Sequence, residues 1–411
     1  MQQKMPNILT LETNKYAIKI ENFEGPLDLL CHLIDKNKMN INDIKLSEIT
    51  DQYIEYINKM EEMNLEVTSE FLVMASTLIY LKSKSLLPSD NEESEEIGNT
   101  PMIKINYRYN NKEKSVFAKL EYYNLTGSIK DRVAFYIINS AIKREDLKDG
   151  MPIIEATSGN TGISLSALGA RYKHPVYIFM PDWASTERVK LMQGYGANVI
   201  LISKEEGGFI QCVKEAKKMA DEKNGFLANQ FENYDNFLAH YETTGKEILE
   251  QSNCEIGGFV SGVGTGGTLM GTGKRIKEKF PNMQITAIEP EKMPLLSGGE
   301  IQGQHKIEGI GDDFIPKLVD LKSIDKIIKI NDDDAVNMSR RLAKELGLGV
   351  GISSGANFIG SVLLGEEMTN TVATVFADDN KKYLSTDLFK PIDENKEFIS
   401  NKIELISYEN I

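Results

Sequence analysis

The chain has few of the residues on which disulfide-rich and metal-binding proteins depend. Its 411 residues include three cysteines, four histidines and one tryptophan. Cys31, Cys212 and Cys254 lie far apart, and no CxxC motif or Cys/His cluster has the spacing of a zinc site. We therefore expect free, reduced thiols, no disulfide framework and no metal site.

Long apolar runs and an excess of positive charge are also absent. No apolar run reaches about 20 residues, the length that a membrane-spanning helix needs. Met1–Thr13 lacks the apolar stretch of a signal peptide. The formal net charge of −14 disfavours a surface for nucleic acid or anionic membranes. These features predict a cytoplasmic protein with neither a membrane nor a direct nucleic-acid partner.

The N-terminal part of the chain has the pattern of a small helical module. After an expected tail over residues 1–15, a short alternating run at Tyr16–Ile20 is typical of a strand. Apolar residues then recur at helical spacing over residues 26–34, 47–60 and 68–87. Residues 16–88 are therefore predicted to form a mainly helical module.

The rest of the chain has a different pattern. The polar, acidic stretch at residues 89–96 is predicted to be a linker. From Ile97 to residue 388, short β-branched runs alternate with amphipathic stretches, which predicts an α/β fold with a doubly wound parallel sheet. Residues 389–411 are charged and weakly periodic, so we expect a surface tail there.

The first of three glycine-rich segments contains one lysine at the start of a predicted helix. The segment is Thr126–Arg132, and the lysine is Lys130. An amine that loses its proton can attack an aldehyde, and the positive end of a helix disfavours the ammonium form. Taken alone, the same pattern also fits an ordinary solvated lysine.

The second segment, Glu155–Gly162, follows a predicted strand and precedes a predicted helix. Its backbone N–H groups and hydroxyls suit an anion such as an amino-acid carboxylate. A simple helix cap built from Ser, Thr and Asn has the same composition.

The third segment, Gly262–Thr268, has the composition of a loop that holds a phosphate group. It also satisfies G-x-G-x-x-G, with Glu289 downstream, so a nicotinamide dehydrogenase is an alternative. A P-loop is excluded because no Gly-Lys-Ser/Thr closes the run. A dehydrogenase places this motif at the start of its α/β domain and has no use for an upstream lysine. A phosphate-bearing aldehyde cofactor uses both.

Four motifs occur in an order that resembles one enzyme family. They are GSIKDR at residues 127–132, TSGNTG at 157–162, GTGGT at 264–268 and GISSG at 351–355. Together they resemble the cysteine synthase (O-acetylserine sulfhydrylase) family of pyridoxal-phosphate enzymes. IGNTPM at residues 97–102 resembles the opening of that family, and HKIEGIG at residues 305–311 resembles its active-site-closing segment. The resemblance covers residues 97–388.

The resemblance implies a fold, a cofactor and a reaction. The fold is fold-type II, similar to the β-subunit of tryptophan synthase, and the cofactor is pyridoxal 5'-phosphate held as a Schiff base on Lys130. The reaction is β-replacement, which makes cysteine from O-acetylserine and sulfide in a homodimer. A related enzyme such as a cystathionine β-synthase differs only in substrate choice and stays open as an alternative.

The resemblance also implies a role for each site residue. Lys130 is the catalytic residue, Asn160 binds the ring 3-oxygen, and Ser353 meets the pyridine nitrogen. The implied phosphate-binding residues are Gly264, Thr265, Gly266, Gly267 and Thr268. The implied substrate-binding residues are Thr157, Ser158, Gly159, Thr161 and Gln230. One departure is Leu125, which stands where the family usually has proline.

The N-terminal module resembles an unrelated family. YAIKIENFEGPLDLL at residues 16–30, SEITDQY at 47–53 and SEFLVMA at 69–75 are similar to the start of ScpA, the kleisin subunit of the bacterial SMC condensin complex. In that family this part lies against the SMC neck, while a C-terminal winged-helix domain binds the other SMC head. The chain lacks the latter, so the resemblance implies binding to one SMC neck at most. A chromosome-segregation interaction protein with an inert C-terminal domain is the second alternative.

Overall fold

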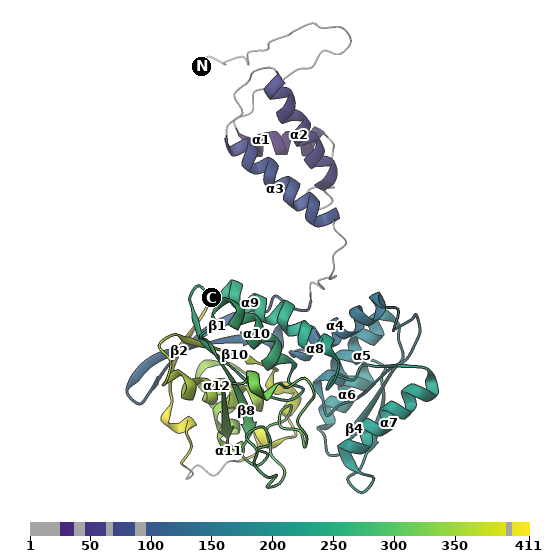
Figure 1. Ribbon diagram of the computed structural model, residues 1–411, viewed down its shortest axis with the longest axis vertical. Helices are drawn as coiled ribbons and strands as arrows, with labels where there is room; N and C mark the ends of the chain where they lie inside the picture. The colour runs from purple at the N-terminus through teal and green to yellow at the C-terminus, as the bar shows by residue number, and fades with distance from the viewer. Residues whose placement is uncertain (1–24, 37–45, 63–68, 87–95, 392–396) are drawn as a thin grey trace. The chain divides into compact units, whose positions relative to one another are not determined.

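The computed structural model describes residues 25–36, 46–62, 69–86, 96–391 and 397–411. The chain divides into two compact units, Met1–Glu93 and Ser94–Ile411, and each is described by itself (Figure 1). The division falls within the predicted linker at residues 89–96, most of which lies outside the described residues. The predicted tail over residues 1–15 and the predicted strand at Tyr16–Ile20 also lie outside them.

The described part of the first unit consists of the helices α1 (Pro26–Lys36), α2 (Leu46–Glu62) and α3 (Ser69–Leu86). Their apolar faces meet in one small core, formed by Leu29, Leu33, Ile49, Tyr53, Ile57, Phe71 and Leu78. Other apolar side chains of the same helices stay exposed, namely Leu27, Leu72, Val73 and Ile79. A cluster this small cannot cover every apolar position of three helices, so part of the apolar surface is left to solvent.

Within the residues that the structure describes, the second unit contains two sheets. The larger sheet has the strand order β11 (Glu404–Asn410), β1 (Met102–Tyr109), β2 (Lys112–Leu120), β10 (Thr371–Phe376), β7 (Ile256–Gly262), β8 (Gln284–Pro290) and β9 (Lys326–Ile330). The smaller sheet has the order β5 (Asn198–Ile202), β4 (Val176–Pro181), β3 (Ile153–Ala156) and β6 (Phe226–Leu227). The predicted α/β class is confirmed.

The larger sheet is mixed, whereas the sequence pattern predicted parallel strands only. Strands β2, β10, β7, β8 and β9 are parallel, but β1 pairs antiparallel with both β2 and β11. The β1–β2 hairpin turns at Asn110 and Asn111, whose φ angles are 49° and 62°. Asparagine tolerates this left-handed region, and two such residues in a row make the tight turn that suits a twisted hairpin.

The expectation of a C-terminal surface tail over residues 389–411 is wrong for its last part, which forms the strand β11. The last strand, β11, extends the larger sheet by pairing with β1 from Ile103–Asn410 to Arg108–Glu404. Lys104 forms an ion pair with Glu409, and Arg108 forms one with Glu404. The strand lies at the sheet edge with mostly exposed side chains, and this is why its sequence shows no alternation of apolar and polar residues.

Helices cover both sheets, as expected for doubly wound units (Figure 1). Those packed around the smaller sheet are α4 (Lys130–Lys143), α5 (Asn160–Tyr172), α6 (Thr186–Gly194), α7 (Gly208–Lys223) and α8 (Tyr234–Ala239). Those packed around the larger sheet are α9 (Gly245–Gln251), α10 (Gly273–Lys279), α11 (Asp332–Leu346) and α12 (Ile352–Gly365). Two π-helical turns, at His240–Thr244 and Thr268–Thr272, continue directly into α9 and α10.

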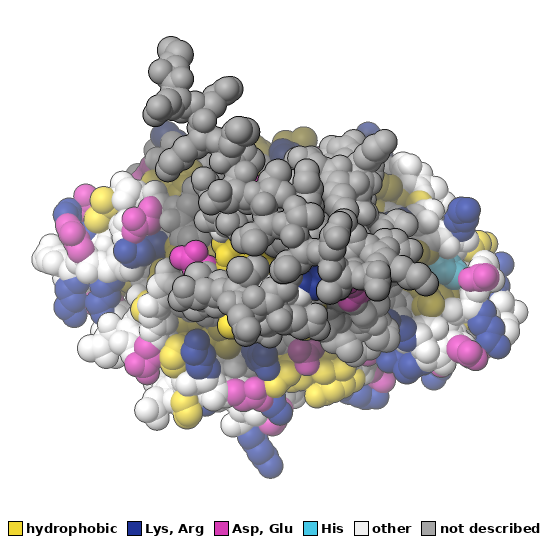
Figure 2. Space-filling model, turned by 90° about the horizontal axis from the view of Figure 1, so that it is seen from above, with side chains coloured by type: hydrophobic (Ala, Val, Ile, Leu, Met, Phe, Trp, Pro, Cys, Tyr) yellow, Lys and Arg dark blue, Asp and Glu magenta, His cyan; other side chains and the backbone are white. Residues whose placement is uncertain are grey.

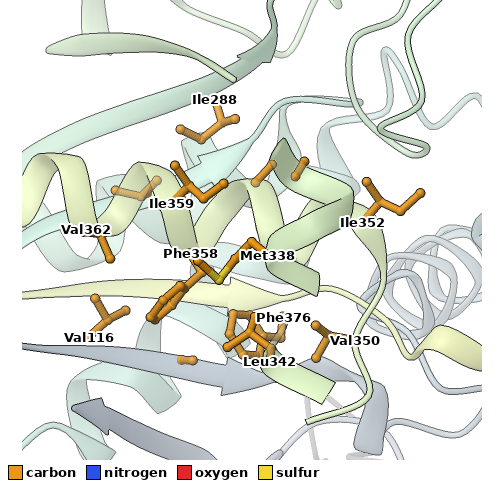
Figure 3. Packing of buried hydrophobic residues seen from close by; sticks show 14 of the residues in the cluster. Val116, Ile288, Met338, Leu342, Val350, Ile352, Phe358, Ile359, Val362 and Phe376 are labelled. Atoms are coloured by element: carbon orange, nitrogen blue, oxygen red, sulfur yellow. The ribbon is translucent and has the colours of Figure 1, made fainter. Parts of the chain in front are cut away.

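The main core lies between the larger sheet and the helices α11 and α12 (Figure 3). Phe358 contacts Tyr107 and Phe376 edge to face, with ring centroids 6.0 and 6.5 Å apart. Met338 and Leu342 of α11 pack against this aromatic group from the next layer. This packing fixes the start of α12 relative to β10, and both elements carry site residues.

The surface of the second unit carries both signs of charge. Figure 2 shows Lys and Arg side chains next to Asp and Glu side chains on the visible face. Among the described residues, no helix combines the length and the apolar character that a membrane crossing requires.

Three loops that line the site begin where parallel strands end, one strand in the smaller sheet and two in the larger sheet. They follow β3 at Thr157, β7 at Val263 and β10 at Ala377. In open α/β sheets, ligands bind at the carboxyl edge of the strands. The topology therefore collects residues that are more than 200 positions apart in the sequence.

Candidate active site

A cavity that is open to solvent lies at this edge of the second unit. The predicted site residues that line it are Lys130, Thr157, Ser158, Gly159, Asn160, Thr161, Gln230, Gly264, Thr265, Gly266, Thr268 and Ser353. Gly267 belongs to the same loop but does not line the cavity. The structure thus brings together residues that the sequence offers as separate motifs.

The amine of Lys130 lies in this cavity, at the first residue of α4. Burial lowers the pKa of the amine to about 8, against the opposing effect of the carboxylates of Asp312 and Asp378. Desolvation is thus the largest cause of the lowered pKa. About a tenth of the amine is therefore neutral, and nucleophilic, at pH 7, far more than for an ordinary lysine.

The loop before Lys130 is held by hydrogen bonds that do not involve Leu125. Asp131 accepts hydrogen bonds from the backbone N–H and the hydroxyl of Thr126, at 2.8 and 2.6 Å. Gly127 has a φ of 79°, a conformation that favours glycine, and its carbonyl accepts a hydrogen bond from Lys382 at 2.9 Å. The side chain of Leu125 is exposed. The loop therefore keeps its shape without the proline that is usual in the family.

The loop Thr157–Thr161 is braced by buried polar side chains. The hydroxyl of Thr161 donates to Gln230 at 2.6 Å. Glu155, at the end of β3, accepts a hydrogen bond from the backbone N–H of Gln230 at 3.0 Å, and burial raises the pKa of Glu155 to about 7. Glu155 thus fixes Gln230 beside the loop, and sequence reasoning gave it no such role.

The loop Gly264–Thr268 is shaped by close backbone contacts. A Cβ atom on Gly264 would lie 2.4 Å from the carbonyl oxygen of Gly309, and Gly266 has a φ of 88°. The hydroxyl of Thr265 accepts a hydrogen bond from Asn236 at 2.8 Å, and that of Thr268 lies 3.2 Å from Nε2 of His240. Glycine is required at positions 264 and 266, so the loop presents backbone without side chains to a ligand there.

His240 supports this loop as a neutral ring. It is fully buried, and its Nδ1 lies 3.0 Å from the hydroxyl of Thr244. Burial, together with the charges of Lys130 and Arg132, lowers the pKa of His240 well below its usual value. Neither Asn236 nor His240 was among the predicted site residues, because neither belongs to a local motif.

Asn160 and Asp378 meet at the floor of the cavity. The side-chain amide of Asn160 donates to Asp378 Oδ2 at 2.7 Å, and the hydroxyl of Tyr383 donates to the same oxygen at 2.8 Å. The second oxygens of both side chains, Asn160 Oδ1 and Asp378 Oδ1, are buried and have no hydrogen-bond partner among the described residues. Buried polar atoms are almost always paired in proteins, so these two indicate a place for a polar ligand.

An ion pair spans the cavity between its two walls. Arg188 of α6 pairs with Glu308, and its guanidinium lies 4.9 Å from the ring centroid of Tyr383. Arg188 is buried, and its Nε has no partner among the described residues. Glu308 belongs to the segment that resembles an active-site closure, whereas Arg188 and Tyr383 gave no sequence signal.

The residues present fit pyridoxal phosphate. A deprotonatable amine, a glycine loop into which no Cβ fits, the Ser353 hydroxyl and two unpartnered buried oxygens share one cavity. The amine suits an aldehyde, the loop suits a phosphate, and the hydroxyl suits a ring nitrogen.

Comparison with known proteins agrees with this geometry. A family model described as pyridoxal-phosphate dependent enzyme matches residues 93–378. The chain belongs to this family. A cysteine synthase of Staphylococcus aureus is 43% identical over 296 residues, which cover 71% of this chain and 95% of that protein. The prediction of a pyridoxal-phosphate dependent enzyme of the cysteine synthase type is confirmed, and with it the cofactor.

Two solved structures extend the comparison. A hydrogen sulfide-producing enzyme from Fusobacterium nucleatum is 46% identical, with a TM-score of 0.74, and the match covers 82% of this chain and 99% of that chain. An O-acetylserine dependent cystathionine β-synthase from Helicobacter pylori is 35% identical, with a TM-score of 0.67, covering 72% and 97% of the two chains.

A second family model, segregation and condensation protein ScpA, matches residues 33–146. This match confirms that the N-terminal part resembles ScpA and that two families meet in one chain. It overlaps the first match, because β1, β2 and α4 lie within both ranges. In the structure these three elements belong to the second unit.

Proposed function

We propose that the second unit catalyses β-replacement and makes cysteine from O-acetylserine and sulfide. The observation that carries the proposal is that the Lys130 amine, the loop Thr157–Thr161 and the loop Gly264–Thr268 line one cavity. A cofactor held at its two ends and an amino-acid substrate held by its carboxylate need these three elements together.

Three groups of the cavity hold the cofactor in this proposal. Bound pyridoxal phosphate supplies an aldehyde that condenses with amines and a ring that withdraws electrons from the substrate α-carbon. Lys130 holds the aldehyde end, and the backbone of Gly264–Thr268 holds the phosphate. The Ser353 hydroxyl would meet the ring nitrogen without a full charge, which would favour loss of the β-substituent over transamination.

The remaining groups act on the substrate. The loop Thr157–Thr161, braced by Gln230, binds the substrate carboxylate through N–H groups and hydroxyls. Lys130 takes the proton from the α-carbon, which its lowered pKa allows near neutral pH. The Arg188–Glu308 pair lines the cavity beside the reacting atoms and reduces the room for water there.

Product formation by the purified, cofactor-loaded chain tests the proposal. With O-acetylserine and sulfide we expect cysteine and acetate in equal amounts, and none from Lys130→Ala. Homocysteine, offered in place of sulfide, measures the cystathionine β-synthase alternative in the same assay. Equal use of both nucleophiles would contradict the assignment to cysteine formation, and so would the absence of any product.

Release of sulfide from cysteine is a second candidate reaction at the same site. Similarity to a hydrogen sulfide-producing enzyme supports it. So does Asp312, a carboxyl group in the cavity that cysteine formation does not use. Measuring sulfide release from cysteine, with and without O-acetylserine, distinguishes cysteine breakdown from cysteine formation.

For the first unit, we propose binding to one SMC neck. The resemblance to ScpA supports this, together with the exposed apolar side chains of Leu72, Val73 and Ile79 on α3. Calorimetric titration of the full chain with a purified SMC neck fragment tests it, and Leu72→Glu should weaken binding at least tenfold. Asp51→Ala, an exposed change on α2, is the matched control. Equal affinity of the Leu72→Glu and control variants would contradict the proposal.

A further inference from the structure

The carboxyl group of Glu155 lies behind the proposed substrate site rather than in it. Glu155 is buried at the end of β3 and does not line the cavity, whereas Gln230 and Thr161 do. One carboxylate oxygen accepts a hydrogen bond from the backbone N–H of Ala156 at 2.8 Å, and the other accepts one from the backbone N–H of Gln230 at 3.0 Å. Glu155 therefore joins two segments that lie 75 positions apart in the sequence.

Gln230 connects this carboxylate to the cavity. Its side-chain oxygen accepts the hydrogen bond of the Thr161 hydroxyl at 2.6 Å, and its backbone carbonyl accepts one from the side chain of Asn236 at 2.8 Å. Both of these partners are neutral, so Glu155 is the charged partner of Gln230 among the described residues. A hydrogen bond to an ionised group is roughly twice as strong as one between neutral groups. The position of Gln230 thus depends most on the charge of Glu155.

Loss of that charge would weaken the hold on Gln230. The two N–H groups belong to the backbone and cannot turn away from the carboxyl group. A protonated carboxyl group has an O–H that must avoid both donors, and its oxygens are weaker acceptors than those of a carboxylate. Burial raises the pKa of Glu155 to about 7, while the N–H groups of Gln230 and Ala156 oppose the shift. The carboxyl group is therefore ionised above pH 7 and mostly neutral below it.

No charged side chain of the described residues is among the causes that set the pKa of Glu155. Strand β3 packs against α5, α7, β4 and β6. The titratable side chains of these elements that are not exposed are Tyr172, Tyr177, Cys212 and Glu215. Beside the cavity, the ionisable groups of Lys130, Arg188 and His240 interact electrostatically with groups other than Glu155. The charge of Glu155 is therefore expressed mainly through its two backbone hydrogen bonds.

We propose that Glu155 is a positioning residue for substrate binding. Its carboxylate holds the backbone of Gln230, and through it the side chains of Gln230 and Thr161, in the arrangement that receives a substrate carboxylate. This inference rests on the proposed β-replacement function and adds to it a dependence of substrate affinity on the ionisation of one buried group. Affinity is high while Glu155 is ionised and falls as the pH is lowered through its pKa.

Binding of an amino acid without a leaving group tests the inference. L-alanine has the carboxylate and the amine of O-acetylserine but no β-substituent to lose, so calorimetric titration of the cofactor-loaded full chain gives its Kd without turnover. Glu155→Gln keeps the size of the side chain and removes its charge. The Kd of Glu155→Gln relative to that of the wild type should be about tenfold higher near pH 8.5. Near pH 5.5 the difference should shrink to about twofold, because the wild-type group is then neutral too.

The ratio of the two Kd values cancels the titration of L-alanine itself, which is the same for both proteins. Glu222→Gln, an exposed glutamate on α7, is the matched control and should give the wild-type Kd at each pH. A purely structural role of Glu155 would give a ratio that does not vary with pH.

Gln230→Ala provides a second, independent measurement. It keeps the backbone N–H and the Glu155 carboxylate but removes the side chain that they position. The Kd for L-alanine should rise about tenfold near pH 8.5 and should differ little from that of the wild type near pH 5.5. Adding Glu155→Gln to this variant should change the Kd less than about twofold, since the two residues act through one contact. This comparison of Gln230→Ala with the wild type also holds if Glu155→Gln does not fold.

The outcomes separate this inference from the proposed function. A ratio that is constant with pH would overturn the inference, and so would fully additive effects of the two substitutions. Tighter binding by Glu155→Gln would overturn it as well, since the charge would then repel the substrate. If cysteine forms from O-acetylserine and sulfide while the ratio is constant, the proposed function stands and the inference fails. If the ratio varies as expected and no cysteine forms, Glu155 positions a carboxylate site and the proposed function fails.

Discussion

The two walls of the cavity are built in different ways. On the side of the larger sheet, the loop Gly264–Thr268 presents backbone to the cavity, since no Cβ fits at Gly264. On the side of the smaller sheet, the side chains of Thr161, Gln230 and Arg188 line the cavity and are held by hydrogen bonds and an ion pair. A backbone wall fixes one shape for one ligand, whereas a side-chain wall can be altered one group at a time.

This difference indicates how a β-replacing enzyme assigns its cofactor and its substrate to different walls of one cavity. An unchanging cofactor suits the backbone wall, and a substrate whose identity varies within the family suits the side-chain wall. We therefore expect substitutions in the first wall to reduce cofactor loading and substitutions in the second to change the KM for substrate. Lys130 lies between the walls, because its helix packs with the smaller sheet while Ile129 donates a hydrogen bond to Ala377 of the larger one.

The largest effect is expected for Lys130→Ala, since this residue acts on both ligands. Loss of its proton-transfer role alone should lower kcat about 10²–10⁴-fold. Visible absorbance of bound cofactor should fall as well, because the amine that fixes the aldehyde is gone. Lys148→Ala, an exposed lysine after α4, is the control and should retain activity and absorbance. Full activity of Lys130→Ala would contradict the assignment of this cavity as the active site.

Gly264→Ala should have the next largest effect, and on the cofactor only. The added Cβ would lie 2.4 Å from the carbonyl oxygen of Gly309, so the loop or its neighbour must move. Overpacking of this kind costs about 1–3 kcal/mol, or roughly 5- to 150-fold in the Kd for cofactor. Gly194→Ala, where nothing lies within 4 Å of the new Cβ, is the matched control. An equal Kd for cofactor in the two variants would contradict the proposal that the loop Gly264–Thr268 holds the cofactor.

The motifs of this site could be predicted from sequence, because each is local. Glycine, serine and threonine in short runs between a strand and a helix are unusual enough to be noticed, and all but one of the predicted residues line the cavity. The strands and helices of the parallel core were also predictable within a few residues. For example, β5 (Asn198–Ile202) is one of the short runs rich in β-branched residues.

Site residues that belong to no local sequence motif could not be predicted. Asp312 is one of 61 acidic residues, and only topology brings it to the cavity beside Lys130. The same holds for Arg188 and Tyr383, which lie far apart in the sequence but contact each other in the cavity. The edge strand β11 was missed for another reason, since exposed edge strands have no buried face to impose alternation.

Thr161→Val tests the side-chain wall with a moderate effect. The change keeps the shape but removes the hydroxyl that donates to Gln230 at 2.6 Å and is proposed to face the substrate carboxylate. Hydrogen bonds to charged groups contribute about 1.5–3 kcal/mol, so the KM for O-acetylserine should rise roughly 10- to 100-fold. Cofactor loading should not change, and Ser140→Ala on α4, outside the cavity, serves as the control. A loss of cofactor in Thr161→Val would show that the walls do not separate the two ligands.

The smallest effect is expected on the pH at which cofactor capture is half-maximal. This pH reports on Lys130, which lies between the two walls. Burial lowers the pKa of Lys130 to about 8 in the cofactor-free protein, below the ordinary value of 10.5, while Asp312 and Asp378 oppose the shift. The neutral amine is the nucleophile, so cofactor capture should be slow below pH 8 and should rise through a midpoint near 8. Stopped-flow absorbance of the cofactor at a series of pH values measures this midpoint. Asp312→Asn removes an opposing negative charge and should move the midpoint to lower pH, whereas Asp313→Asn should move it less. A midpoint near 10.5 would mean that the Lys130 amine is solvated, and neither wall would then enclose it.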